Sequence, residues 1–361
     1  MVLIHRMVQV PMSRSRRVRK ERSRSLHAGL VAGALGLTLT IAGCGGSNGG
    51  SSTSGSSGGG AGSLKGKTIA LVGYGNSNPW GAAFNKQFEA QLGSSGVKIK
   101  DLTTMDPGTQ VQKFSQAVAG QPDLIVVAVL DTKAMAVPIQ KAKQAGVDVL
   151  AVDGKTDPSV AGAVMSVLSD NERLGEFAAQ NIIDGLKAQG RQSGKIIVLT
   201  GTKSMLVTQD RMVGFRKVMS GAPQYQVVAE QDANWDPTLS GKIAQQLLAR
   251  YGCNGVQAAY GMADYMALPI IQAAKQAGCA VGGKKGLVVT SSNCFKAGID
   301  SIKAGELYGS ATEDPITIAT QTAAYVTKFL SGQHPPKHET VQEDRITAAN
   351  VDQFAAQCSH A

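Results

Sequence analysis

From Lys67 onward, short apolar runs rich in β-branched residues alternate with longer amphipathic segments. Such runs are typical of buried strands, and apolar residues three to four positions apart predict helices. The predicted strands are 68–72, 124–127, 149–152, 196–199, 226–229, 256–260, 287–290 and 307–311. The predicted helices are 84–92, 134–144, 172–186, 212–219, 241–251, 266–276 and 316–329. This alternation indicates an α/β fold with parallel sheets covered by helices on both faces.

The length of this region favours two lobes. From Leu64 to Ala361 the chain has 298 residues, which is long for a single hydrophobic core. The predicted strands and helices are also too many for a single sheet with its covering helices. We therefore expect two sheets, each with its own helices.

The first 43 residues have the three-part layout of a secretory signal, with a basic stretch at 13–20, an apolar run at about 26–41 and then small residues. The apolar run is short for a membrane-spanning helix. The junction Ile41-Ala42-Gly43-Cys44 resembles the lipobox of bacterial lipoproteins, whose cysteine carries lipid. An ordinary cleavage site, or a membrane anchor with an incidental cysteine, is the alternative. The Arg16-Arg17 pair leaves both Sec and twin-arginine export open.

Residues 45–63 are almost entirely Gly and Ser. This composition cannot bury enough apolar surface to offset its ordering entropy, so it predicts a flexible tether with a reach of about 20–25 Å. We expect residues 1–43 to be a lipoprotein signal peptide and residues 44–64 to be the lipidated cysteine and tether. The protein is then exported and lipid-anchored to the outer face of the cell membrane.

The basic charge of the chain is concentrated in the predicted signal. The whole chain has a formal net charge of +10, but residues 1–43 contain eight of its 36 Lys and Arg and one of its 26 Asp and Glu. The remainder carries a net charge of only +3 and has no basic run. Nucleic acid is therefore not an expected partner.

Five cysteines are present. With Cys44 lipidated, Cys253, Cys279, Cys294 and Cys358 remain, an even number for an oxidising compartment. Cys253 and Cys279 each lie near the end of a predicted helix flanking one strand, which favours a disulfide between them; a bridge between Cys294 and Cys358 is the weaker expectation. Free buried thiols are the alternative. No Cys or His spacing is typical of a metal site, and we expect neither metal nor cofactor.

Polar residues follow the predicted strands, where ligands bind in open α/β sheets. These loops contain Tyr74 to Trp80, Asp131, Asp153 to Lys155, Ser169 to Asn171, Gly201 to Lys203 and Ser291 to Asn293. The only two tryptophans, Trp80 and Trp235, lie in such loops, one in each half and each close to an Asn, Asn78 or Asn234. An aromatic ring against the C–H face of a sugar, with polar side chains at its hydroxyls, can bury a small hydrophilic ligand. Tryptophans packed at the lobe surfaces are the alternative.

This pattern resembles the ribose-type periplasmic binding proteins, the type I solute-binding subunits of ABC importers, over about residues 67–332. The motifs that carry the resemblance are Asn78-Pro79-Trp80, Val152-Asp153, Ser169-Asp170-Asn171, Asp210 to Phe215, Asp264 to Leu268 and Lys303 to Leu307. The resemblance implies two Rossmann-like lobes joined by a three-segment hinge, with a ligand enclosed between them. It places 65–169 and about 314–335 in the N-terminal lobe, and 170–313 and about 336–361 in the C-terminal lobe.

The resemblance also implies a set of ligand-binding residues. They are Asn78, Trp80, Asp153, Arg211, Trp235, Asn293 and Glu313. Arg211 would supply a bidentate fork, and Asp153 would accept from ligand hydroxyls. The alternatives are a surface salt bridge between Arg211 and Asp210, and a helix cap at Asp153. For Asp131 and Asp264 we expect helix capping rather than ligand contact.

Several positions depart from the ribose binders. This chain has Ala128 where the ribose binders have Asn, Asp153-Gly154 where they have Asp-Arg, and Ala263-Asp264 where they have Asn-Asp. It has Glu313 in place of their hinge Gln, and Ser292-Asn293 in place of their Phe-Asp. Because a site built for a particular hydroxyl discriminates through its polar groups, these changes argue against ribose itself. The segment 263–269 also resembles the branch that binds autoinducer-2 and rhamnose.

We therefore expect a monomeric solute-binding lipoprotein that captures a sugar or sugar-like polyol and delivers it to an ABC permease. A receptor for an autoinducer-2-like or rhamnose-like ligand, or a signalling receptor of the same fold, is the alternative. An enzyme is disfavoured because the chain has no G-x-S-x-G, its Gly73 to Asn78 segment departs from G-x-G-x-x-G, and the predicted folded part has histidine only at 334, 338 and 360. The export signal and the lack of a helix-turn-helix domain exclude a cytoplasmic repressor.

Overall fold

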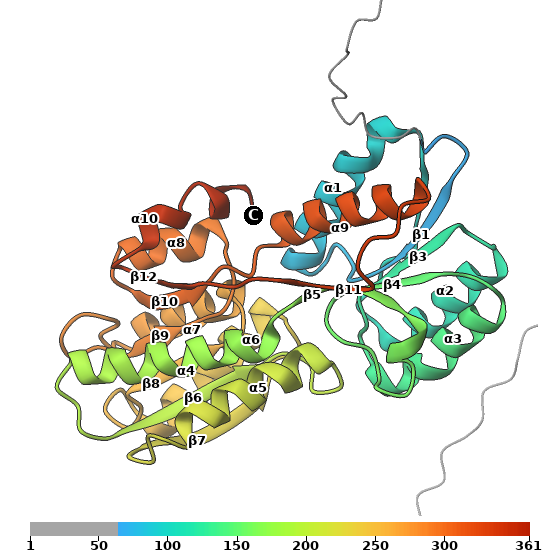
Figure 1. The fold of residues 1–361 in the computed structure, drawn as a ribbon. Helices are drawn as coiled ribbons and strands as arrows, with labels where there is room; N and C mark the ends of the chain where they lie inside the picture. The colour runs from blue at the N-terminus through green and yellow to red at the C-terminus, as the bar shows by residue number, and fades with distance from the viewer. Residues whose placement is uncertain (1–63) are drawn as a thin grey trace, which may run out of the picture. The chain divides into compact units, whose positions relative to one another are not determined.

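The computed structural model describes residues 64–361, which build two lobes, each around a six-stranded sheet (Figure 1). The signal segment, Cys44 and the tether lie outside the described residues. None of the helices within residues 64–361 has the length and apolar character that a membrane span requires. The expected fold class, two Rossmann-like α/β lobes joined by a three-segment hinge, is confirmed.

The first sheet is entirely parallel, in the order β11-β5-β4-β3-β1-β2. Its strands are β1 (Thr68–Val72), β2 (Lys98–Asp101), β3 (Leu124–Val127), β4 (Val149–Asp153), β5 (Met165–Ser169) and β11 (His338–Val341). Its helices are α1 (Pro79–Leu92), α2 (Pro107–Ala119), α3 (Thr132–Gln144) and α9 (Pro315–Leu330), with short 3₁₀ turns at Gly93–Ser95 and Ala161–Ala163.

Both faces of the first sheet are buried, which explains its uninterrupted apolar strands. In β1, Ile69 and Leu71 pack in one core, whereas Ala70 and Val72 pack in the other. This is the two-residue alternation of a strand covered on both sides. Helices α1 and α9 lie side by side, and α2 packs with α3 (Figure 1).

The second sheet has the order β12-β10-β9-β8-β6-β7, and only β12 runs antiparallel to its neighbour. Its strands are β6 (Gly194–Thr200), β7 (Tyr225–Asp232), β8 (Ala258–Gly261), β9 (Val288–Thr290), β10 (Leu307–Ala311) and β12 (Arg345–Thr347). Its helices are α4 (Asn171–Ala188), α5 (Leu206–Met219), α6 (Pro237–Tyr251), α7 (Asp264–Gln276), α8 (Lys296–Lys303) and α10 (Val351–Phe354), followed by a 3₁₀ turn at Gln357–His360.

The chain crosses between the sheets three times: from β5 to α4, from β10 to α9, and from β11 to β12. The expected third boundary, near residue 336, is wrong. Strand β11 pairs in parallel with β5, from His338 opposite Ser166 to Val341 opposite Ser169, so it belongs to the first lobe. The crossing therefore lies at residues 342–344. The sequence gives little sign of β11, because this edge strand buries only Val341.

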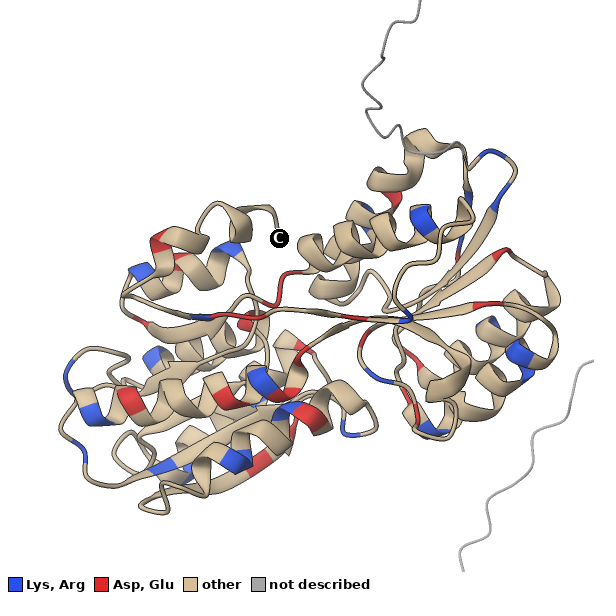
Figure 2. Cartoon of the chain, in the orientation of Figure 1, with Lys and Arg blue, Asp and Glu red and all other residues tan. Residues whose placement is uncertain are grey.

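Charged residues of both signs are interleaved along the second lobe, where α4 and α5 lie together (Figure 2). Lys217 lies 2.7 Å from Glu176 across the two helices, and Arg216 lies 2.8 Å from Glu230 of β7. This face is therefore a mixed, solvated surface rather than a patch of one sign.

Two disulfides lie within the second lobe and join the cysteine pairs expected from the sequence. Cys253 is bonded to Cys279, with their Cα atoms 5.1 Å apart, and Cys294 to Cys358, with theirs 4.8 Å apart. The second bridge ties the segment after β9 to the C-terminal turn. Both of its cysteines are fully buried, whereas Cys253 is exposed.

We predict that replacing both Cys294 and Cys358 with Ser lowers the free energy of unfolding more than replacing both Cys253 and Cys279. The bridges span 64 and 26 residues, which corresponds to about 4 and 3.5 kcal/mol of chain entropy. The first pair of substitutions also buries two serine hydroxyls. Guanidinium unfolding of the two double variants measures the difference, and equal losses or the reverse order would contradict this account.

Candidate functional site

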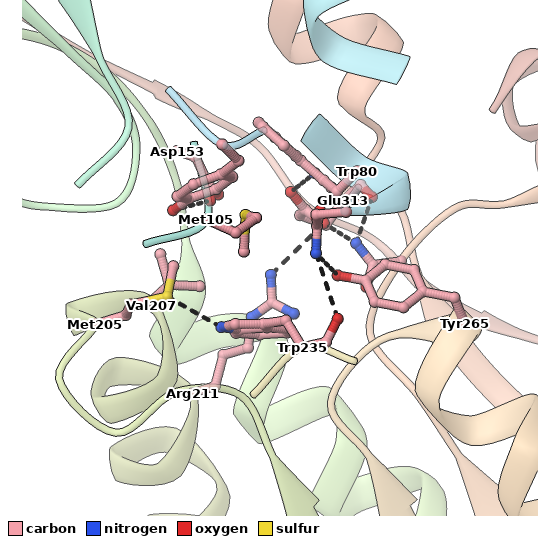
Figure 3. Close-up of a pocket in the computed structure, with 12 residues that line it drawn as sticks. Trp80, Met105, Asp153, Met205, Val207, Arg211, Trp235, Tyr265 and Glu313 are labelled. Carbon is pink, nitrogen blue, oxygen red and sulfur yellow. Dashed lines mark hydrogen bonds and ion pairs between the residues drawn. The ribbon is translucent and has the colours of Figure 1, made fainter. Parts of the chain in front are cut away.

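A pocket lies between the lobes, where loops at the carboxyl ends of strands from both sheets meet (Figure 3). Its lining residues are Tyr74, Asn78, Trp80, Met105, Asp153, Met205, Val207, Arg211, Trp235, Tyr265, Asn293 and Glu313. The empty space between them is about 310 Å³. All seven residues expected to bind ligand lie in this lining, which brings together positions more than 230 residues apart in the chain.

The start of α1 fixes two of these residues. Asn78 caps the helix by accepting from the Gly81 N–H at 3.0 Å, and Pro79 follows at the first helical position. The Asn78 amide then donates to the Trp235 carbonyl at 3.4 Å and the Tyr265 hydroxyl at 3.3 Å, both in the second lobe. Asn78 therefore caps a helix and also links the lobes.

The Trp80 indole is fixed by a row of aromatic rings one turn apart along α1. It stacks on Phe84 at 5.1 Å between ring centroids, and Phe84 stacks on Phe88 at 5.7 Å. Its N–H donates to Glu313 Oε1 at 2.6 Å. A side chain of the first lobe therefore binds a carboxylate at the second crossing.

Asp153 ends β4 with a positive φ of 65°, a strained conformation that Asp tolerates better than most residues. Its Oδ2 accepts from the Tyr74 hydroxyl at 3.2 Å. Its carbonyl accepts from the Asn171 amide at 3.1 Å, at the first crossing. Because the side chain accepts no backbone N–H bond, the helix-cap alternative for Asp153 does not apply.

Arg211 reaches the pocket because two glycines let α4 and α5 touch. A Cβ on Gly175 would lie 1.8 Å from the Arg211 carbonyl oxygen, and one on Gly214 would lie 1.8 Å from the Glu172 carbonyl oxygen. No larger residue fits at either position, so the glycine of the Arg-Met-Val-Gly-Phe motif is a packing requirement. The contact brings the Arg211 side chain under the cleft.

The Arg211 guanidinium is buried and its direction is fixed. Nε donates to Asn171 Oδ1 at 2.9 Å, and Nη1 donates to the carbonyls of Met262 at 2.8 Å and Ser292 at 3.4 Å. Nη2 lies 3.5 Å from Glu313 Oε2. The three hydrogen bonds use the N–H of Nε and both N–H groups of Nη1, and leave the two on Nη2 next to Glu313. The surface-pair alternative is wrong, since Asp210 instead pairs with Lys155 at 2.8 Å.

Trp235 lies over the loop that follows β6. A Cβ on Gly201 would lie 1.8 Å from its indole, so only glycine admits the ring at this place. The indole N–H donates to Met205 Sδ at 3.2 Å, and the Arg211 guanidinium lies 5.3 Å from the ring centroid. Trp235 has a positive φ of 57°, a strained backbone of the kind that clusters at ligand sites.

Asn293 and Glu313 lie next to each other, after β9 and β10. The Asn293 amide donates to Glu313 Oε2, and the Cys294 N–H donates to the Glu313 carbonyl at 3.1 Å. The Cys294–Cys358 disulfide follows directly. Glu313 is therefore bonded to Trp80, Asn293 and Arg211 and belongs to the second crossing.

Two pocket residues keep a buried oxygen with no hydrogen-bond partner: Asp153 Oδ1 in the first lobe and Asn293 Oδ1 in the second. Residues 64–361 contain four other such side-chain atoms, none on a residue that lines this pocket. A buried polar atom without a partner is costly, so these acceptors indicate where a ligand would donate.

Burial dominates the electrostatics of the pocket. Burial raises the pKa of Glu313 well above its ordinary range and Asp153 raises it further, while Arg211 opposes both. Burial also raises the pKa of Asp153, although Arg211 and the Tyr74 hydroxyl favour its charged form. The tyrosines are shifted too, since burial raises the pKa values of Tyr74 and Tyr265. One cation thus faces two carboxyls, and burial raises the pKa of both.

A further acid lies in the hinge. Glu343, at the third crossing, is 8% exposed; its Oε2 accepts from the Thr312 hydroxyl at 3.1 Å, and its Oε1 has no partner. Thr312 also receives the Asp344 N–H at 2.7 Å, so it ties the second crossing to the third. Burial raises the pKa of Glu343 from 4.5 to about 8.

The remaining sequence predictions had mixed outcomes. Asp131 caps α3, as expected, by accepting from the Ala134 N–H at 2.9 Å. The capping role of Asp264 in its own helix is wrong, because Asp264 is the first residue of α7 and the N-cap position is Ala263, with no side-chain cap. Asp264 instead accepts from the hydroxyls of Ser291 and Ser310 and from the Phe295 N–H at 3.0 Å. It fixes the loop that presents Asn293.

Five lining residues were not predicted: Tyr74, Met105, Met205, Val207 and Tyr265. Tyr74 and Tyr265 stood inside motifs that the sequence singled out, so their position was a usable signal. Met105 follows β2, a polar edge strand absent from the predicted strands. Within residues 64–361, no three His, Cys, Asp or Glu side chains are arranged to bind a metal ion.

Residues 69–334 match the sequence family described as the periplasmic binding protein domain. The fructose import binding protein FruE of Bifidobacterium longum is 26% identical over 335 residues, covering 89% of this chain and 94% of that protein. The D-ribose/D-allose-binding protein of Pseudomonas aeruginosa is 28% identical over 253 residues, covering 69% and 74%.

Solved structures are similar in fold. A galactofuranose binding protein superposes with a TM-score of 0.73 at 19% identity, over 81% of this chain and 98% of the other. The Caulobacter myo-inositol binding protein, bound to myo-inositol, gives 0.73 at 20% identity, over 81% and 96%. At these identities the likeness supports the two-lobed fold alone.

We predict that the free energy of unfolding of the native chain falls relative to that of Glu343→Gln as the pH rises from about 4.5 to 8. In this window the folded state keeps a proton on Glu343 that the unfolded state has lost, because its folded pKa is raised to about 8. The difference reaches at most about 5 kcal/mol, at 1.36 kcal/mol per pH unit. Urea unfolding of both proteins at several pH values measures it, and parallel curves would show that Glu343 is ionised throughout.

Proposed function

Because the chain belongs to the periplasmic binding protein family, we propose that it is the solute-binding subunit of an ABC importer and that it encloses one sugar or sugar-like polyol between its lobes. The protein is exported, as the family implies. We further propose that the lipid-bearing Cys44 anchors it to the outer face of the cell membrane. There it delivers its ligand to a permease.

The observation that carries the sugar proposal is the pair of unpartnered acceptors, Asp153 Oδ1 and Asn293 Oδ1, in an aromatic pocket. Hydroxyl groups are the donors that a neutral ligand brings to such acceptors. The indoles of Trp80 and Trp235 supply apolar ring surface for the C–H groups of the same ligand. The free space between these side chains is small, so a ligand larger than a single sugar is disfavoured.

The charges in the pocket favour an uncharged ligand. Asp153 and Glu313 both contribute to raising the pKa of Arg211, against the effect of its burial. The Arg211 guanidinium therefore already faces a carboxyl of the protein, Glu313 at 3.5 Å. An anionic or cationic ligand would bring an unpaired charge into this buried space, which is costly. Sugars and polyols add none.

Contacts across the mouth of the pocket indicate a closed state. The Ser204 hydroxyl of the second lobe donates to the Leu130 carbonyl of the first at 3.1 Å, and the Ser204 carbonyl accepts from the Thr132 hydroxyl at 3.3 Å. Lys155 and Asp210 pair across the same gap. Since these contacts join the two lobes, opening the cleft requires them to break, and rotation about the three crossings would do so.

The relatives favour import over signalling. FruE is named an import binding protein, and its match spans nearly the full length of both chains. The names of the relatives mention several sugars, among them fructose, ribose and allose. They support a sugar for this chain without selecting one. An autoinducer-2-like or rhamnose-like ligand remains an alternative within the same pocket.

We predict that at least one pentose, hexose, deoxysugar, polyol or autoinducer-2 raises the melting temperature of the purified protein and changes its tryptophan fluorescence. A ligand that binds the folded state and not the unfolded state stabilises the protein, which raises its melting temperature. The fluorescence should change because both tryptophans line the pocket. Arg211→Ala should weaken the best ligand by about tenfold or more, the scale of a lost charged hydrogen bond.

The matched control is Arg216→Ala, on the same helix but exposed and paired with Glu230 outside the pocket; it should leave affinity unchanged. Circular dichroism shows whether each variant is folded. If amino acids or nucleosides shift the melting temperature while no sugar or polyol does, the sugar proposal fails.

We predict that Cys44→Ser moves the protein from the membrane fraction to the soluble envelope or the medium. Without the thiol there is no site for lipid, and the membrane affinity of the anchor comes from its acyl chains. Cell fractionation and the intact mass of the N-terminal peptide measure this. Ser51→Ala, in the tether, is the control. A Cys44→Ser protein that stays with the membrane would refute the lipid anchor.

A further inference from the structure

One side of the pocket is formed by three apolar, flexible or branched side chains, Met105, Met205 and Val207, which we call the apolar corner. Met105 belongs to the first lobe, in the segment between β2 and α2, and the other two lie at the start of α5 in the second. Figure 3 shows the three on the same side of the pocket, beside Asp153. Met205 and Val207 are only 2% and 4% exposed, so the corner is part of the buried site.

The side chains of the apolar corner provide no strong hydrogen-bonding group. The donor next to it, the Trp235 indole N–H, is directed to Met205 Sδ at 3.2 Å and is therefore already engaged. A ligand hydroxyl pressed against these carbon and sulfur atoms would lose its water without gaining a side-chain partner there. A methyl or C–H group in the same place would be buried favourably.

The position of Val207 depends on a glycine across the cleft. Its Cγ2 atom lies 2.5 Å from the place that a Cβ on Gly154 would take, so any larger residue at 154 would displace it. Gly154 directly follows Asp153, whose Oδ1 is one of the two unpartnered acceptors. The apolar corner and a polar acceptor are thus neighbours in the chain as well as in the pocket.

Most other polar groups of the pocket are bonded to each other. Trp80 donates to Glu313, Asn78 bonds across to the second lobe, and Arg211 is held by four contacts. The unpartnered acceptors are Asp153 Oδ1 and Asn293 Oδ1. Few ligand hydroxyls can therefore be satisfied, at Asp153 next to the apolar corner and at Asn293.

We propose that the pocket selects a deoxysugar, a monosaccharide with a methyl group where a common hexose carries a hydroxymethyl group, and that the methyl group packs against Met105, Met205 and Val207. The inference rests on the proposed function, since it specifies the class of sugar that enters the same pocket. The hydroxyls of the ring then donate to Asp153 and Asn293. Methionine suits this role because its flexible thioether adapts to the shape of a small apolar group.

The test uses two series of sugars that share their ring hydroxyls and differ in one substituent. D-galactose, D-fucose and L-arabinose carry hydroxymethyl, methyl and hydrogen at the same carbon, as do L-mannose, L-rhamnose and L-lyxose. Dissociation constants are measured by calorimetry or tryptophan fluorescence. We expect the methyl member of at least one series to bind about tenfold to a hundredfold more tightly than its hydroxymethyl member, the range in which an apolar pocket rejects an added hydroxyl.

Two variants link this preference to the apolar corner. Val207→Thr exchanges a methyl group for a hydroxyl at nearly constant shape, and Met105→Gln puts a polar carboxamide in place of the thioether of a partly buried side chain of similar length. Both variants should reduce, several-fold, the ratio of the dissociation constant of the hydroxymethyl sugar to that of the methyl sugar. Val213→Thr, the same substitution at an exposed position of the same helix, should leave the ratio unchanged. If Val207→Thr does not fold, Met105→Gln decides.

The outcomes separate the two proposals. If hydroxymethyl sugars bind as tightly as methyl sugars or more tightly, or if both corner variants keep the native ratio, the deoxysugar inference is overturned and the sugar-binding function stands. The deoxysugar inference is also overturned, and the sugar-binding function stands, if sugars outside the two series raise the melting temperature and no methyl member binds. If no sugar of any kind binds, both proposals fall.

Discussion

The buried ion pair between Arg211 and Glu313 is the interaction on which the cleft depends. Their side chains are 2% and 0% exposed, and each is tied to a different part of the molecule. Arg211 extends from α5 to Asn171 at the first crossing, whereas Glu313 belongs to the second crossing and receives the Trp80 N–H from the first lobe. Removing either side chain would leave buried polar groups of the other without that partner, which is costly. The pair therefore connects the binding surface directly to two of the segments about which the lobes would rotate.

Close backbone packing makes this arrangement possible. Gly175 and Gly214 let α4 and α5 touch so that Arg211 points under the cleft, and Gly201 makes room for the Trp235 indole. At each position a Cβ would lie about 1.8 Å from a neighbouring atom, so the constraint is steric rather than conformational. Strain is stored instead at Asp153 and Trp235, whose positive φ angles aim two pocket side chains. The rigid scaffold thus supports a site whose polar groups are nearly all preorganised.

The alternation of strands and helices predicted the two-lobed α/β fold, and the resemblance to the ribose-type binding proteins named seven residues that the structure places in one pocket. Prediction from the sequence failed where tertiary contacts decide. Strand β11 buries one residue and has no periodic signature, so the third crossing was placed too early. Met205 is the N-cap residue of α5, Val207 lies in its first turn, and Met105 follows the polar strand β2. Nothing in the local sequence marks them as pocket residues, because the pocket forms only where the two lobes meet. Asp264 looked like a helix cap because the sequence near it does not show its true partners, which are serines far away in the chain.

In the proposed function, a neutral ligand completes the hydrogen bonding of a pocket whose other polar groups are mostly bonded within the protein. A crystal structure of the chain with its tightest-binding sugar tests this most directly. We expect one ligand between the lobes, with a hydroxyl donating to Asp153 Oδ1, another to Asn293 Oδ1, and the ring against Trp80 or Trp235. A ligand bound elsewhere, or one that leaves both oxygens without a ligand donor, would contradict it.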